Sequence, residues 1–196
     1  MKKFLALLLL LVFCLCAFCS CGTEGKGQVT SEVAQQNGFI SNIPDGYKPH
    51  IEEDYALVYP SDWQQKVVDG VMTFGKEYST IKISYEDATA QRLEEIESMS
   101  TESFKKKFNF GAEATIGVEF EGIEVTHYNH NGLDLTVSKY KESRSSNYSL
   151  VTECYFCIDS RLYTLRIYEY VENDDKYVNV TDTVLESLTK IRIDSN

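Results

Sequence analysis

The chain has 196 residues, with 30 acidic and 19 basic side chains, so its net charge is −11 at neutral pH. A strongly acidic chain is repelled by phosphate backbones, and we therefore expect no nucleic-acid partner. The length suits one domain, which can bury a hydrophobic core without disulfide bonds.

The first 20 residues have the layout of a secretory signal peptide. A basic start, Met1-Lys2-Lys3, precedes residues 4–18, which carry no charge, and Cys19-Ser20-Cys21-Gly22 follows. This ending resembles a bacterial lipoprotein signal, in which the cysteine after the cleavage site is lipidated. An uncleaved membrane helix is the alternative, but residues 4–19 are fewer than the ~20 that a spanning helix needs. A simple secretory cleavage lacks an Ala-x-Ala site.

The lipoprotein resemblance assigns lipidation to Cys21. Ser20 before it is small, whereas the other candidates, Cys14, Cys16 and Cys19, each follow a bulky residue. The resemblance implies acyl chains such as palmitate, which anchor the chain in a lipid bilayer. We therefore expect a protein on the extracytoplasmic face of the cell membrane.

Residues 21–51 are predicted to form a flexible tether, because they are rich in glycine and polar residues. Pro44-Asp45-Gly46 is a turn signal near its end, and residues 39–47 are also able to fold back onto the domain. The folded domain is expected at residues 52–196.

From residue 55 onwards the pattern predicts mostly strands. An amphipathic helix is expected at residues 91–108, broken near residues 98–101, and a second helix at residues 177–191. Asn131-Gly132 is the strongest hairpin signal. The expected strands, defined by alternating or apolar runs, are residues 56–59, 70–74, 80–85, 115–120, 123–130, 133–140, 148–158 and 162–171. This order predicts an α+β fold with an antiparallel sheet of about six or seven strands flanked by helices.

Two short motifs resemble PsbP-like and DcrB-like domains. Tyr59-Pro60-Ser61-Asp62-Trp63 resembles the start of such domains, and Val184-Leu185-Glu186-Ser187-Leu188 resembles their last helix. The resemblance covers about residues 52–193. It implies a domain that is not an enzyme, often found in bacterial lipoproteins or secreted proteins.

Cys154 and Cys157 form a Cys-x-x-Cys pair, which is typical of redox and zinc sites. The segment around them is predicted to be a strand, where residues three apart point to opposite faces. We therefore expect two separate thiols rather than a disulfide or a zinc site.

No other motif predicts a cofactor or catalysis. His127 and His130 fall on opposite strand faces unless a bulge realigns them, and His50 lies in the expected tether. The acidic loop at residues 172–175 lacks the glycine and ligand spacing of a calcium loop. A hydrolase with paired carboxylates stays open, because spacing along the chain does not show distance in space.

The strongest binding candidates lie in the strand at residues 162–171. There Tyr163 shares a face with Leu165 and Ile167, and the opposite face carries Arg166, Tyr168 and Tyr170. Tyrosine and arginine are enriched in binding hot spots, although tyrosine also favours strands for packing reasons. Trp63 is expected to fill the core beneath the sheet.

These observations favour a non-catalytic domain that binds an envelope protein or a cell-wall component. The alternative is a small-molecule carrier, in which the curved sheet forms a half-open, lipocalin-like cup. A deep apolar pocket between sheet and helix would favour the carrier, and a filled core with a flat aromatic surface would favour the interaction domain.

Overall fold

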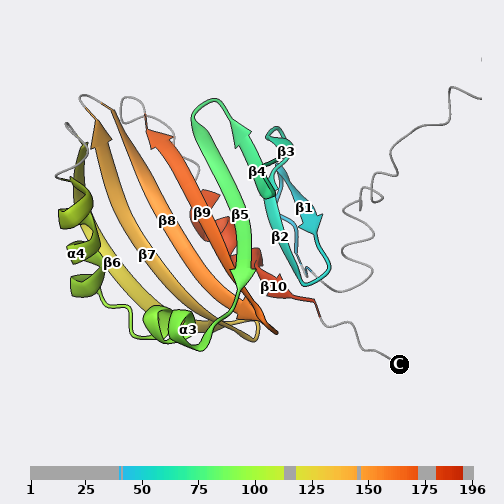
Figure 1. The fold of residues 1–196 in the computed structure, drawn as a ribbon. Helices are drawn as coiled ribbons and strands as arrows, with labels where there is room; N and C mark the ends of the chain where they lie inside the picture. The colour runs from blue at the N-terminus through green and yellow to red at the C-terminus, as the bar shows by residue number, and fades with distance from the viewer. Residues whose placement is uncertain (1–39, 41, 113–117, 145–146, 172–179, 192–196) are drawn as a thin grey trace, which may run out of the picture.

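The computed structural model describes residues 40, 42–112, 118–144, 147–171 and 180–191. The expected signal peptide, the lipidation site at Cys21 and the acidic loop at residues 172–175 lie outside these residues. A seven-stranded sheet dominates the fold, and helices and a smaller sheet pack against it (Figure 1).

The large sheet is antiparallel throughout, with the strand order β3-β4-β5-β9-β8-β7-β6. The chain enters it through three antiparallel strands, leaves for two helices, and returns as a four-stranded meander. The strands are β3 (Gln64–Val68), β4 (Val71–Lys76), β5 (Ser79–Asp87), β6 (Val118–His130), β7 (Leu133–Arg144), β8 (Asn147–Ile158) and β9 (Arg161–Val171). The predicted α+β class with an antiparallel sheet is therefore confirmed.

The turns of the meander follow the local sequence. Asn131 and Gly132 join β6 to β7 with φ angles of 50° and 77°, as the hairpin signal predicts. Residues 115–120 and 123–130 were expected to be two strands, but β6 is a single strand from Val118 onwards. Its register shifts between Glu121 and Glu124, where Gly122 takes a φ of 62°, so the glycine forms a bulge rather than a strand end.

A small sheet, β1 (Tyr47–Ile51), β2 (Tyr55–Pro60) and β10 (Thr189–Lys190), packs behind the large one. The folded part thus begins before the expected boundary at residue 52, because all of β1 pairs with β2, from Ala56 to Pro60. Ile40 is also buried against this sheet.

The last helix is shorter than predicted. Helix α5 (Val180–Ser187) ends where Thr189 and Lys190 pair with β2. The buried positions Val184, Leu188 and Ile191 fit a helical stripe, but Ile191 is buried because β10 continues the small sheet rather than the helix.

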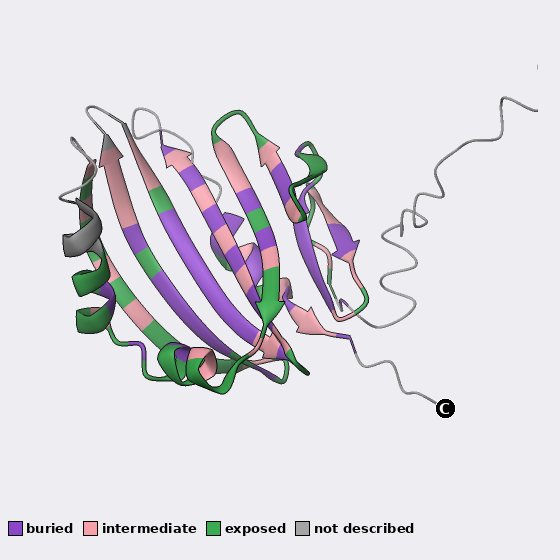
Figure 2. Cartoon of the chain, viewed as in Figure 1, coloured by how far each residue is buried: buried purple, intermediate pink, exposed green. Residues whose placement is uncertain are grey.

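The back face of the large sheet holds the main core. Every second residue of β9, including Leu165 and Ile167, packs there with residues of β2 and α5. Trp63 is buried in the same cluster, as expected for a core residue. Burial alternates along β9 in Figure 2, so the front face of the strand is chemically distinct from the back.

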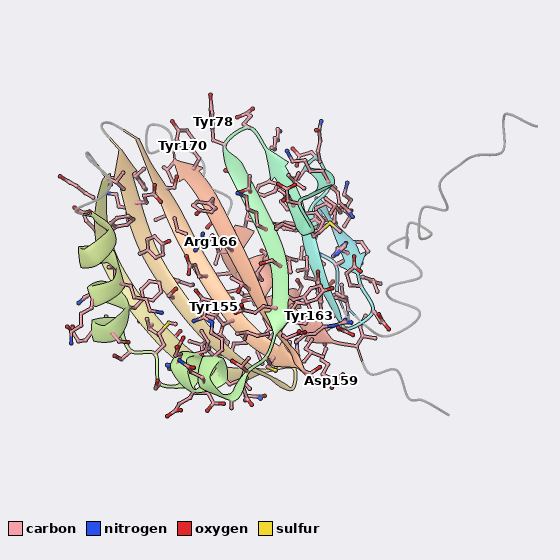
Figure 3. The ribbon with its side chains drawn as sticks, in the orientation of Figure 1. Tyr78, Tyr155, Asp159, Tyr163, Arg166 and Tyr170 are labelled. Carbon is pink, nitrogen blue, oxygen red and sulfur yellow. The ribbon has the colours of Figure 1, made fainter. Side chains whose placement is uncertain are left out.

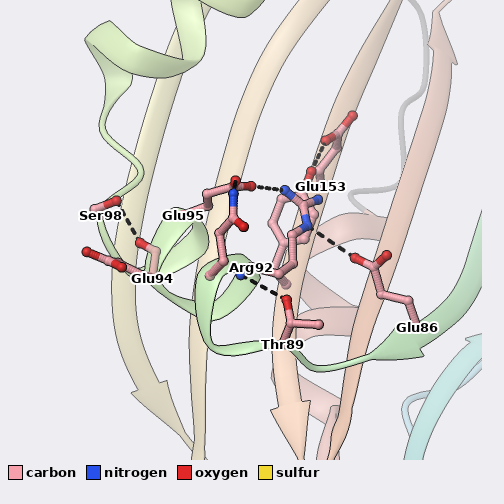
Figure 4. A network of polar contacts seen from close by, with 9 residues as sticks. Glu86, Thr89, Arg92, Glu94, Glu95, Ser98 and Glu153 are labelled. Atoms are coloured by element: carbon pink, nitrogen blue, oxygen red, sulfur yellow. Dashed lines mark hydrogen bonds and ion pairs between the residues drawn. The ribbon is translucent and has the colours of Figure 1, made fainter.

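The front face carries α3 (Ala90–Glu97) and α4 (Thr101–Ala112), and the predicted break near residues 98–101 is confirmed. Thr89 caps α3 by accepting a hydrogen bond from Arg92 N (3.2 Å), and the Arg92 side chain bridges Glu86 and Glu95 (Figure 4). Helix α4 lies against β6, where Thr101 Oγ1 accepts from Val125 N at 3.0 Å. The helices therefore cover the β6 side and one end of the front face (Figure 1).

Within the described residues, no helix is both long enough and apolar enough to cross a membrane.

Candidate binding face

Arg166, Tyr168 and Tyr170 lie on the front face of β9, on the opposite side from Tyr163, Leu165 and Ile167. All three are half-buried, and no described helix lies over the part of β9 that carries them (Figures 1 and 3). The structure therefore brings together the residues that strand alternation placed on one face. Their role in binding stays a prediction.

Strand β5 adds a cation and an aromatic ring to this surface. Lys82 is directly opposite Arg166 in the β5–β9 register, and its Nζ lies 5.8 Å from the centre of the Tyr168 ring. Tyr78, which precedes β5, is 74% exposed, and its ring centre lies 5.0 Å from that of Tyr170. We call these five residues the front patch: Tyr78, Lys82, Arg166, Tyr168 and Tyr170. Figure 3 labels Tyr78, Arg166 and Tyr170 of this set.

A buried carboxylate holds the arginine of the front patch in place. Glu153 on β8 is the cross-strand neighbour of Arg166, and its side chain is 4% exposed whereas that of Arg166 is 42% exposed. The Glu153 carboxylate accepts hydrogen bonds from Arg166 Nη2, from the Tyr140 hydroxyl at 3.2 Å and from the Tyr155 hydroxyl at 2.5 Å. Arg166 Nη1 in turn donates to the Tyr168 hydroxyl at 3.4 Å.

This network fixes the protonation of its members. Burial, and next the charge of Glu153, raise the pKa values of Tyr140 and Tyr155 well above the ordinary value for tyrosine. Burial lowers the pKa of Arg166, but the neighbouring Glu153 outweighs it, and the net pKa is raised. Both phenols stay neutral donors, and Arg166 stays charged with one side of its guanidinium at the surface.

The register extends the positive charge of the front patch to β3, two strands beyond β5. Lys66 on β3 pairs with Thr73 on β4, which pairs with Lys82 on β5, which pairs with Arg166 on β9. Lys66 and Lys82 are exposed, and neither has a carboxylate partner within the described part of the chain. We call Lys66, Lys82 and Arg166 the cation row.

The histidines are not brought together. His127 bonds to Thr136 Oγ1 and to the Met99 carbonyl, whereas His130 contacts the Glu186 carbonyl on the opposite face. His50 lies in β1 rather than in a tether, and it is buried. Among the described residues, no three His, Cys, Asp or Glu side chains are grouped closely enough to hold a metal ion.

Cys154 and Cys157 are both free, as predicted from their strand. Cys154 is fully buried in the back-face core, and burial raises the pKa of its thiol to about 12. Cys157 is on the other face, where burial and then Asp159 also raise its pKa. A raised pKa keeps each thiol protonated, and the thiolate is the reactive form, so neither cysteine is activated as a nucleophile.

Several hollows lie in the described part of the chain, and the linings of two of them bear on function. A groove of about 570 Å³ runs between α3 and the ends of β6 to β9, and its walls include Leu93, Ile96, His127, Tyr155 and Cys157. A smaller pocket of about 250 Å³ lies where the two sheets meet. In it, Asp54 accepts hydrogen bonds from Arg161 Nη1 (2.8 Å) and from the Tyr163 hydroxyl.

Sequence reasoning missed Lys82, Glu153 and Tyr78. Their places depend on the register between β5, β9 and β8, and β5 and β9 are about eighty residues apart in the chain. The alternation within β5 is a usable signal, because it places Lys82 on the face opposite Ile81 and Ile83. It does not show which strand pairs with β5.

The sequence matches no family model and no curated protein. Among solved structures, the chain is similar to cyanobacterial PsbP (CyanoP) from Synechocystis sp. PCC 6803, with a TM-score of 0.55 and 14% identity over 87% of this chain and 99% of that one. A protein from Bacteroides thetaiotaomicron VPI-5482 has a TM-score of 0.47 and 12% identity, covering 76% of this chain and 50% of that one. LpqN, involved in cell envelope biogenesis of Mycobacterium tuberculosis, has a TM-score of 0.42 and 15% identity, covering 86% and 100%. The CyanoP similarity shows that the chain has a PsbP-like fold.

Proposed function

We propose that this protein is an extracytoplasmic lipoprotein whose folded domain binds an envelope protein or a cell-wall component through the front patch. The observation that carries the proposal is the contrast between the two faces of β9. Residues of its back face are buried against β2 and α5, whereas no described helix covers Arg166, Tyr168 and Tyr170 on its front face.

The composition of the front patch supports binding. Tyrosine and arginine supply most of the energy in many interfaces, because they combine apolar area with a polar end. Arg166 is held by Glu153, and Tyr168 is held by Arg166, so both side chains are ordered before a partner arrives. Binding to preordered side chains loses less conformational entropy.

A non-catalytic role is part of the same proposal. The buried carboxylate Glu153 is occupied by three donors, and both thiols have raised pKa values. The described residues thus offer no activated nucleophile, and the polar cluster of the front face acts as a support for Arg166.

The membrane anchor rests on the sequence of the first 22 residues. Ser20-Cys21-Gly22 behind an uncharged run favours acylation of Cys21, and two or more acyl chains make membrane attachment stable. Metabolic labelling with a fatty acid in a bacterial host tests this. Cys21→Ser should lose the label and leave the membrane fraction, whereas Cys19→Ser should keep both, and label that persists in Cys21→Ser would contradict the assignment.

The binding role is tested with the full chain in cells. The double variant Tyr168→Ala/Tyr170→Ala should fold but retain less envelope protein or cell-wall material after cross-linking than the wild type. Each hot-spot aromatic contributes on the order of 2 kcal/mol of binding free energy. The control is Tyr128→Ala, which removes a partly exposed tyrosine from β6. Equal retention by the wild type and the folded double variant would contradict a docking role for the front patch.

A small-molecule carrier is the second candidate, and one observation favours it. The groove of about 570 Å³ beside α3 has the size of a ligand site, and Leu93, Ile96 and Leu162 give it an apolar wall. Its polar groups are already paired, as for His127 with Thr136 and Asn129 with Asp134. The test is binding of an apolar fluorescent probe. Binding to the wild type and to the Tyr168→Ala/Tyr170→Ala variant, but not to Leu93→Trp, would support the carrier.

A further inference from the structure

We propose that the cation row binds a chain of uronic acids, that is, a carboxylated polysaccharide. This inference rests on the proposed binding function of the front patch and names the chemistry of the partner. It depends on the placement of Lys66, Lys82 and Arg166 across three strands and on the aromatic rings beside them.

The cation row is a local reversal of the charge of the protein. The whole chain has a net charge of −11, yet the row places three cations on one face across β3, β5 and β9. Neighbouring strands are about 4.8 Å apart, so the backbones at Lys82 and Arg166 are one spacing apart and those at Lys66 and Lys82 about 10 Å apart. An extended polymer that carries several carboxylates along its length can reach all three cations of this row.

The arrangement is unfavourable for stability on its own. Like charges directly opposite each other on neighbouring strands repel, and Lys82 is directly opposite Arg166. The Glu153 carboxylate pairs with Arg166, but it also accepts hydrogen bonds from the hydroxyls of Tyr140 and Tyr155. The charge of Lys82 therefore stays uncompensated within the described residues, and a bound carboxylate would compensate it.

The part of this face formed by β5 and β9 does not suit strand addition by an extended acidic peptide. A peptide that adds to a sheet needs the free main-chain groups of an edge strand. Strands β5 and β9 each have a hydrogen-bonded strand on both sides, so they offer only side chains. The rings of Tyr78, Tyr168 and Tyr170 beside the cations offer faces on which the C–H groups of sugar rings can pack.

Gly75 lies on the same face as the cation row, in the next line of residues. Gly75 on β4 is opposite Thr80 on β5, which is opposite Tyr168, in the line next to the cation row. A Cβ at Gly75 would approach Thr80 Cγ2 and the Ser79 carbonyl to 3.1 Å. Glycine at this position therefore allows a close approach of β5 beside the cation row.

Calorimetric titration of the full chain, purified in a nonionic detergent, with polygalacturonate tests the inference. Polygalacturonate should bind in 20 mM salt, and binding should weaken strongly in 500 mM salt, because exposed charges are screened. The fully methyl-esterified polymer, which has the same sugar without its charge, should not bind. Lys66→Gln and Lys82→Gln should each weaken binding about threefold, and together about tenfold.

The control variant is Lys106→Gln, which removes an exposed lysine from α4 and should leave the affinity unchanged. The inference is overturned if the esterified polymer binds equally, if Lys106→Gln weakens binding as much as Lys82→Gln, or if poly-glutamate binds more tightly. Absence of polygalacturonate binding also overturns it. If Tyr168→Ala/Tyr170→Ala still lowers retention of envelope material in that case, the proposed function stands and only the ligand class is wrong.

Discussion

His50 should make the domain sensitive to acid. It lies in β1 and is 6% exposed, with its ring 4.9 Å from the Phe74 ring and 6.0 Å from the Tyr55 ring. Burial lowers the pKa of His50 to about 4. The Glu52 carboxylate lies nearby, with its Oε1 3.4 Å from His50 Nε2.

The sign and the size of the effect follow from this pKa. The unfolded chain binds a proton at His50 near pH 6.5, and the folded domain does so only near pH 4. The neutral ring therefore stabilises the folded state fully above pH 6.5, and this contribution is lost as the pH falls from 6.5 to 4. Between pH 7.5 and 4.5 the loss is about 2.5 kcal/mol, since each pKa unit is worth about 1.4 kcal/mol.

Urea unfolding at pH 7.5 and at pH 4.5 measures this loss. His50→Leu cannot titrate, so its free energy of unfolding should fall by about 2.5 kcal/mol less than that of the wild type over the same pH interval. Other titrating groups contribute equally to both proteins and cancel. The control is His130→Gln, a histidine at the end of β6 and outside the His50 cluster, whose loss should match that of the wild type. Equal losses in wild type and His50→Leu would refute the reasoning.

Three further predictions concern buried polar groups. Glu169 is buried and accepts from Val180 N (2.7 Å) and Thr181 Oγ1 (2.7 Å), so Glu169→Ala should lower the free energy of unfolding by about 2 kcal/mol, against no change for Glu86→Ala. Glu153→Leu leaves Tyr140 and Tyr155 without their acceptor and should lower it by about 3 kcal/mol, a value reduced for the partial exposure of Arg166. Cys154 should react with a thiol reagent at pH 8 only after unfolding, whereas Cys157 should react in the folded protein, and mass spectrometry of labelled peptides distinguishes them.

Local patterns in the sequence are sufficient to predict much of the fold. The hairpin at Asn131 and Gly132, the helix break before Thr101 and the two faces of β9 all depend on residues close together in the chain. Each is set by backbone preference or by the two-residue period of a strand. The prediction of Arg166, Tyr168 and Tyr170 on one face belongs to this class.

The missed elements depend on distant pairing. Strand β3 is exposed along its whole length and shows no alternation, so only its pairing with β4 defines it. Strand β1 contains Pro49 and His50 and lies where the composition predicts a tether, but it pairs with β2. The end of α5 was misplaced because the spacing of Leu188 and Ile191 is compatible with a helix, and β10 competes for the same residues through β2.

The two buried carboxylates of the large sheet show which charges are available for binding. Glu169 on the back face is occupied by the first residues of α5, and Glu153 on the front face is occupied by Arg166 and two tyrosines. Burying a charge is unfavourable unless it is paired and hydrogen-bonded, and both acids meet that condition within the fold. Lys66 and Lys82 differ, because their charge opposes that of the whole chain and no described carboxylate compensates it. The lysines, rather than the buried acids, are therefore the charges that a partner would recognise.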